Sequence, residues 1–157
     1  MEPLQVLNCS GTSDEVVGQL MSNPASTPFV LDGVWFASVE AFYIVIRTAN
    51  SDLHAEIRLL DGKKAKNRGS NLKRKFRPTR GCWLGIEFDL GSPHHHALVK
   101  RAIRQKLLQN PELLRDFLAT APRPIVHLTG WPESRFTQLT AAKFTQMLSE
   151  LRDELTA

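Results

Sequence analysis

Helix-start signals recur along this chain and limit what it can fold into. A Ser or Asn precedes a helix-favouring run at three places, two of them followed by proline: Ser38, Ser92-Pro93 and Asn110-Pro111. Such side chains cap the free N–H groups of a helix start, and proline fits the first helical position. Helices are therefore expected over 39–49, 93–109 and 111–119. Helices this short are stable only when they pack against other elements.

Other segments complete the expected order of elements. Helices are also expected from about 13 to 20, from 52 to 60 and from 140 to 155, the last with Phe144, Leu148 and Leu151 on one face. Asp32-Gly33 separates apolar runs at 29–31 and 34–36, which predicts a hairpin, and a short strand is expected at 125–127. The expected fold class is α+β, a mostly helical single domain over 1–157 with a small β-sheet.

Size and composition narrow the class of protein. A chain of 157 residues can bury a core without disulfides, and its two cysteines, Cys9 and Cys82, are expected to be plain reduced thiols. The longest apolar run, Ala41–Ile46, is far shorter than the roughly 20 residues that a bilayer requires. The residues after Met1 lack the basic start of a secretion signal. We expect a cytoplasmic protein without a cofactor, a metal or membrane contact.

Positive charge is concentrated in one stretch. Positions 63–80 hold nine of the 20 basic residues and no acid, so the rest has 11 basic and 16 acidic residues, a net charge of −5. Gly and Pro interrupt 63–93, which we expect to be a long irregular insertion. The charges suit phosphate contacts to DNA or RNA, and the alternative is a solvated loop. The candidate nucleic-acid-binding residues are Lys63, Lys64, Lys66, Lys73, Arg74, Lys75, Arg77 and Arg80.

The helix expected at 39–49 has a polar side. Glu40, Tyr43 and Arg47 fall within about 60° of each other at a rotation of 100° per residue, opposite the apolar side chains. Glu40 and Arg47 are about 10 Å apart along the axis, too far to pair directly but close enough to face one ligand. The alternative is a solvated helix face, as in most amphipathic helices.

Three adjacent histidines follow the helix start at Ser92-Pro93. Successive helical residues point about 100° apart, so one ion cannot bind all three, and we expect no metal site. Free N–H groups at a helix start favour an anion such as a phosphate, which makes His94 a candidate ligand-binding residue. The alternative is a polar helix start without a ligand.

Motifs in both halves of the chain resemble the YbiA-like, or NADAR, family over about 130 residues in order. The opening motif is represented by Ser22-Asn23, Pro28–Trp35 with its Asp-Gly turn, and Ser38-Val39-Glu40-Ala41-Phe42-Tyr43. The later motifs are represented by Ala102–Lys106, Gln109–Leu113, Leu118–Thr120, Ile125-Val126 and Glu150–Arg152. The resemblance implies a YbiA-like domain.

Members of that family are regarded as N-glycosidases of ribose-linked compounds, including riboflavin-pathway intermediates and ADP-ribose attached to guanine. The resemblance thus implies a hydrolase that cleaves a C–N glycosidic bond of a ribose-phosphate or ADP-ribose-linked base. The motif glutamate is Glu40, and its carboxylate would stabilise positive charge on the sugar and activate water. Glu133 is the candidate second carboxylate. The candidate ligand-binding residues are Asn23, Tyr43, Arg47, Arg68 and Trp83.

The chain departs from the family pattern close to Glu40. Ala41 stands where the family has His, Ile44 replaces a usual Gln, and Arg47 replaces a lysine. If that lysine forms an imine with the opened sugar, Arg47 cannot do so, because a guanidinium stays protonated. Arg47 can still bind a phosphate or carboxylate through two hydrogen bonds. The alternative to an enzyme is therefore an inactive module that binds a nucleotide, ADP-ribose or nucleic acid.

Overall fold

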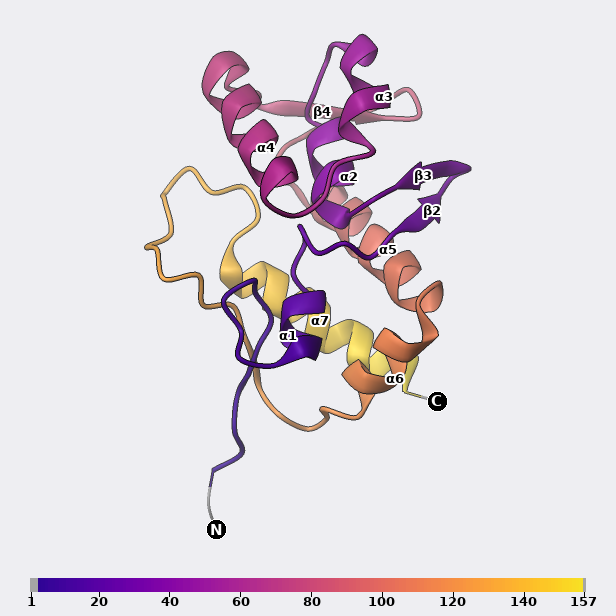
Figure 1. Cartoon of the computed structure of the whole chain (residues 1–157). Helices are drawn as coiled ribbons and strands as arrows, with labels where there is room; N and C mark the ends of the chain where they lie inside the picture. Colours follow the sequence, from indigo (N-terminus) through magenta and orange to yellow (C-terminus); the bar gives the residue numbers. More distant parts are fainter. Residues whose placement is uncertain (1–2, 157) are drawn as a thin grey trace.

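The structure is a computed structural model that describes residues 3–156 (Figure 1). The expectation that the chain starts without a secretion signal concerns in part residues 1–2, which lie outside this range. The elements are β1 (Leu7–Asn8), α1 (Val16–Leu20), β2 (Phe29–Leu31), β3 (Val34–Phe36), α2 (Val39–Val45), η1 (Ser51–Leu53), α3 (His54–Ile57), α4 (Gly62–Phe76), β4 (Arg80–Trp83), β5 (Ile86–Asp89), α5 (Pro93–Leu108), α6 (Pro111–Leu118), β6 (Ile125–Val126) and α7 (Ala141–Leu155). The expected α+β, mostly helical fold is confirmed.

Helix α5 is central to the packing. It contacts α2, α6, α7, β2 and β5. Its buried apolar residues join one continuous core with α2 and α7: Leu98, Val99, Ala102, Ile103 and Leu107. Figure 1 shows α3 and α4 at one end of the molecule and α1 and α6 at the other, with α7 running diagonally between α1 and α6.

Local caps explain where the main helices start. Ser38 Oγ accepts a hydrogen bond from the Ala41 N–H (3.1 Å) at the start of α2, and Ser92 Oγ accepts one from the His95 N–H (3.2 Å) at the start of α5. Thr140 caps α7 in the same way. These bonds satisfy N–H groups that the helix itself leaves free. The predicted starts of these helices are confirmed.

The strands form three separate pairs within residues 3–156, whereas a single small sheet was expected. The hairpin at 29–36 is confirmed: β2 and β3 are antiparallel, and Asp32 and Gly33 have φ of 50° and 80°. Two positive φ angles are what a tight hairpin turn requires. Strand β1 pairs in parallel with β6, joining Leu7 to Ile125. The β4–β5 hairpin was not predicted.

The prediction of an irregular segment at 63–93 is wrong. Helix α4 occupies Gly62–Phe76, and the β4–β5 hairpin follows it. Ala65, Gly69 and Leu72 recur at helical spacing and are buried, while the charged side chains between them face solvent. Small buried residues allow close packing, so the helix forms in spite of its charge.

Two other helices are shorter than expected. Helix α2 ends at Val45, with Ile46 as its C-cap, and not at Ala49. The helix expected at 52–60 is divided into η1 and the short α3. Between residues 3 and 156, no helix is long and apolar enough to cross a membrane.

Candidate active site

Glu40 lies in the first turn of α2, at a position fixed by two neighbouring contacts. Ser38 caps the helix and also donates its hydroxyl hydrogen to the Leu60 carbonyl (2.8 Å). The Glu40 N–H donates to the Asn23 carbonyl (2.9 Å), so the segment after α1 lies against the start of α2. Two predicted site residues, Glu40 and Asn23, are thereby brought together.

Glu40 and Asn23 line a cleft of about 750 Å³. Its walls come from segments that are far apart in sequence: 10–12, 22–25, the first turns of α4, 127–131 and the start of α7. Lys63, Lys66 and Asn67 project into it from α4. The cleft is large enough for a nucleotide-sized ligand.

Two polar side chains in this cleft have no hydrogen-bond partner for their oxygens among residues 3–156. Asn23 Oδ1 is buried and has no hydrogen-bond partner. The half-buried Glu40 carboxylate makes no hydrogen bond or ion pair with any group between residues 3 and 156. Burial raises the pKa of Glu40, and the nearby charges of Arg47 and Lys66 oppose that rise. Unpaired buried polar atoms are costly, and they are often found where a ligand binds.

Gly69 sets the distance between α4 and Glu40. A Cβ atom at this position would lie 3.0 Å from Ile44 Cδ1 and 3.6 Å from Glu40 Oε1. Only a residue without a side chain allows α4 to pack this close to α2 without displacing Ile44. Lys66 precedes Gly69 by about one turn, so the same contact holds Lys66 at the cleft.

A buried lysine supports the Asn23 side of the cleft. Lys106 on α5 is 1% exposed, and its ammonium group donates to the Ser22 carbonyl (3.0 Å). Burial lowers the pKa of Lys106 to about 7. Cys9 lies close enough for its charge to affect Lys106, and burial raises the pKa of Cys9 to about 12. Lys106 was not singled out from the sequence, where it reads as one more helical lysine.

Arg47 and Tyr43 are neighbours, but Arg47 lines a different cavity from Glu40. The guanidinium carbon of Arg47 lies 4.8 Å from the centre of the Tyr43 ring. Arg47 borders a second cavity of about 360 Å³ between α2 and α4, and its Nε is buried without a partner. Burial raises the pKa of Tyr43. The polar face predicted for α2 is thus divided between two cavities.

Trp83 and Arg68 do not line the cleft. Trp83 on β4 packs edge-on against Phe42 at 5.2 Å and donates its indole N–H to Asp32 (2.7 Å). Arg68 on α4 pairs with Glu56 at 3.2 Å. Trp83 therefore packs as an aromatic side chain of the core and does not line the cleft as a ligand-binding residue would.

The three histidines at the start of α5 pack within the fold. His94 stacks on Phe88 at 5.0 Å, and Nε2 of His96 lies 2.8 Å from the Gln138 carbonyl. His95 is fully buried, and its Nδ1 accepts a hydrogen bond from the Gly91 N–H (2.9 Å). Burial lowers the pKa of His95 to about 4. Within residues 3–156, no cluster of His, Cys, Asp or Glu has the arrangement of a metal site.

The candidate nucleic-acid-binding residues fall into four places. Lys63 and Lys66 line the cleft, and Lys73 borders the second cavity. Arg80 is on β4, where it pairs with Asp89 (3.0 Å) and Glu87 (3.6 Å). The others are exposed on or just after α4 and form no ion pair with residues 3–156: Lys64, Arg74, Lys75 and Arg77.

The 128–140 loop holds Glu133, the candidate second carboxylate. Glu133 Oε2 accepts a hydrogen bond from the Ala141 N–H (2.8 Å), so it caps α7 and does not line the cleft. Trp131, from the same loop, does line it, as do Ser10, His127 and Phe144. None of these four was singled out as a site residue, because the β1–β6 pairing that gathers them has no clear pattern in the sequence.

Comparisons with known proteins identify a family and a fold for this chain. The family of "Bacteriophage protein GP30.3" matches residues 16–153. The "Uncharacterized 17.1 kDa protein in Gp30-rIII intergenic region" of Enterobacteria phage T4 is 29% identical over 136 residues, 86% of this chain and 90% of that protein. The NMR structure of the E. coli protein YbiA matches with a TM-score of 0.66 and 21% identity, covering 99% of this chain and 87% of that one.

The likeness to YbiA confirms the YbiA-like fold that the resemblance implied. The family match spans most of the chain, from α1 to the last turn of α7. It includes α2, α4 and the loop before α7, and so most of the cleft around Glu40. The chain therefore belongs to the family of bacteriophage protein GP30.3.

Proposed function

We propose that this protein is an N-glycosidase-like hydrolase that cleaves the C–N bond between a ribose and a base, in a substrate that carries phosphate. The observation that carries the proposal is the unpaired Glu40 carboxylate in a cleft of about 750 Å³ beside a buried, unpartnered Asn23 Oδ1. The substrate class, a ribose-phosphate or ADP-ribose-linked base, follows from the resemblance to the YbiA-like family.

The chemistry of this cleft suits such a reaction. Cleavage of a glycosidic C–N bond leaves positive charge on the sugar, which a nearby carboxylate stabilises. The Glu40 carboxylate accepts a proton from water as the water oxygen bonds to the anomeric carbon. The base leaves with the electrons of the C–N bond and takes up a proton. A carboxyl group whose pKa is raised by burial is better suited to proton transfer near neutral pH.

The remaining groups of the cleft would bind the substrate. Asn23 Oδ1 is a free acceptor for a ribose hydroxyl, and Lys63 and Lys66 supply positive charge for a phosphate. Arg47 borders the second cavity and not the cleft, so it would affect the substrate only through its charge. Glu133 has no part in this mechanism, because its carboxylate caps α7.

Two of the departures from the family pattern do not reach the cleft. Ala41 and Ile44 are buried in the core, at 0% and 2% exposure. They leave the polar groups around Glu40 in place, which favours an active site over the alternative of an inactive binding module.

Glu40→Gln is the decisive test of the proposed function. The variant keeps the shape of the side chain but cannot accept a proton, so turnover should fall by about 100-fold or more. Product formation is measured by mass spectrometry after incubation with ADP-ribose, ADP-ribosylated nucleic acid and phosphorylated pyrimidine ribosides. Glu112→Gln on α6 is the matched control and should leave turnover unchanged. Binding of ADP-ribose by calorimetry with no product from any substrate would instead establish the inactive module.

The same variant should be at least as stable as the parent protein. The raised pKa of Glu40 means that the folded state holds its proton at a pH where the unfolded chain has lost it. Stability contributed by the neutral carboxyl is therefore lost as pH rises through the folded-state pKa. Glu40→Gln removes this loss, so its free energy of unfolding at pH 7 should equal or exceed that of the parent. A less stable variant would show that the carboxylate is structural.

A further inference from the structure

We propose that the cleft accepts one strand of a single-stranded nucleic acid, with Trp131 at the cleft and Phe136 farther along the 128–140 loop stacking on its bases and α4 contacting its phosphates. The inference rests on the proposed function only for the identity of the cleft. It proposes that the substrate is part of a nucleic-acid strand, and it gives a role to Trp131 and Phe136, which no sequence motif identified.

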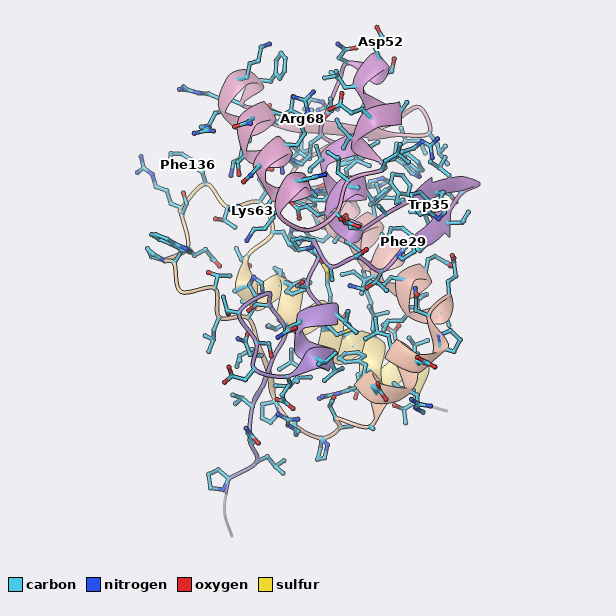
Figure 2. The ribbon with its side chains drawn as sticks, in the orientation of Figure 1. Phe29, Trp35, Asp52, Lys63, Arg68 and Phe136 are labelled. Carbon is cyan, nitrogen blue, oxygen red and sulfur yellow. The ribbon has the colours of Figure 1, made fainter. Side chains whose placement is uncertain are left out.

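Trp131 and Phe136 are unusual in their exposure. Trp131 is 84% exposed, more than any other large hydrophobic side chain between residues 3 and 156, and Phe136 is 69% exposed. Figure 2 shows Phe136 projecting from the outer edge of its loop. Exposed aromatic rings can serve as platforms on which the bases of a single strand stack.

The loop that carries these rings is tied down at both ends. At its start, the Leu128 N–H donates to Asn8 (2.9 Å), and the Leu128 carbonyl accepts from Ser10 (2.8 Å). At its end, the Gln138 amide donates to the Pro78 carbonyl (3.1 Å), and Glu133 caps α7. The aromatic side chains are therefore presented by an anchored loop, which lowers the entropy lost when they bind.

Positive charge and Trp131 share the cleft. Lys63 and Lys66 on α4 and Trp131 line the same cleft of about 750 Å³. Neither lysine forms an ion pair within residues 3–156. Arg135 lies over the Phe136 ring at 4.7 Å, which adds a further cation to the aromatic side. Exposed aromatic rings together with unpaired cations are the combination that binds single strands.

The same features argue against other partners. In a duplex, the flat faces of the bases are stacked and cannot reach a protein ring, so stacking selects single strands. An anionic membrane would need a continuous apolar face, but the surface between the rings and α4 holds the polar groups of Glu40, Asn23 and Asn67. DNA and RNA strands share the phosphates and base faces on which this recognition depends.

Fluorescence anisotropy with a labelled strand of mixed sequence, about 20 nucleotides long, tests the inference. The arms are the DNA strand, the RNA strand of the same sequence, the DNA duplex and vesicles containing phosphatidylserine. We expect either strand to bind more than about tenfold tighter than the duplex. Trp131→Ala and Phe136→Ala should each weaken strand binding by about 5- to 100-fold. Comparison of the DNA and RNA arms identifies the natural polymer.

The controls separate stacking from a general loss of structure. Trp35→Ala removes an exposed tryptophan from the β2–β3 hairpin, away from the cleft, and should leave binding unchanged (Figure 2). Trp131→Phe keeps a ring and should restore most of the affinity. Replacing Lys63 and Lys66 together by Ala should weaken binding and reduce its dependence on salt by roughly 0.7 per lost phosphate contact in a log–log plot.

Three results would overturn the inference: equal affinity for strand and duplex, no difference between Trp131→Ala and Trp35→Ala, or vesicle binding that needs the same two rings. The outcome is independent of the proposed function. Strand binding without hydrolysis of any substrate would reject the glycosidase alone, and hydrolysis of free nucleotides without strand binding would reject this inference alone.

Discussion

Helices α4 and α5 have nearly the same length, 15 and 16 residues, but opposite relations to the rest of the protein. Helix α5 contacts five other elements and buries seven residues, including a lysine. Helix α4 buries only Ala65, Gly69 and Leu72, and directs its charges outward. The difference shows that the two helices have different roles. Helix α5 stabilises the fold, whereas α4 supplies a charged wall to the cleft.

The largest effect on stability should come from a substitution in the buried face of α5. Ile103→Ala on α5 removes a side chain that is 1% exposed and should lower the free energy of unfolding by about 2–5 kcal/mol. Phe76→Ala on α4 removes a larger ring that is 57% exposed and should cost no more than about 0.5 kcal/mol. Urea unfolding of both variants measures the contrast. Equal losses would mean that α4 is part of the stabilising core.

The second effect concerns the charge that α5 buries. The pKa of Lys106 is lowered to about 7 in the folded protein, so between pH 7 and 9 the unfolded chain binds more protons than the folded one. Stability should therefore rise with pH in this window, by at most about 1.4 kcal/mol per pH unit from this group. Lys106→Met should flatten the rise and be more stable than the parent at pH 6. The window ends at pH 9 because the Cys9 thiol, whose ordinary pKa is 9.0, titrates around that pH in the unfolded state.

Urea unfolding at pH 6, 7, 8 and 9 gives the free energies for that prediction. Lys100→Met serves as the control, since Lys100 is a solvent-accessible lysine on the same helix that pairs with Glu150 and Glu154. Its variant should keep the slope of the parent. A parent protein whose stability does not change between pH 7 and 9 would show that Lys106 is charged in the folded state across the whole window.

The smallest effect on stability should come from the exposed cations of α4. Lys64→Ala and Lys75→Ala should each change the free energy of unfolding by less than about 0.5 kcal/mol, because both side chains lie in solvent and form no ion pair within residues 3–156. Thermal unfolding at low and high salt measures this. A larger loss of unfolding free energy in either variant would show that α4, like α5, stabilises the fold.

Elements with local signals were predictable. The caps at Ser38, Ser92 and Thr140 and the Asp32-Gly33 turn act through bonds within a few residues, so the helices and hairpin they define could be read from the sequence. Helix α4 could not, because its three buried residues are hidden among charges and glycine is a poor helix former. Its helical state depends on contact with α2.

The candidate site was predictable only in part. Glu40 and Asn23 were found through the resemblance to a family, and the structure brings them together. Lys66 was assigned to nucleic acid because of its charged neighbours, and its place in the cleft depends on the packing of Gly69. His127 and Trp131 reach the cleft through the pairing of β1 with β6, which are two residues each and too short to give a periodic pattern.

That parallel pairing also determines when the cleft can form during synthesis. Its walls begin at Ser10 and end at Phe144, and Leu7 must find Ile125 before the first and last walls can meet. Contacts between such distant residues form slowly, since a long loop must close first. The growing chain on the ribosome therefore carries Glu40 long before it has a cleft around it. A nascent chain that stops before α7 has Glu40 but not the complete cleft.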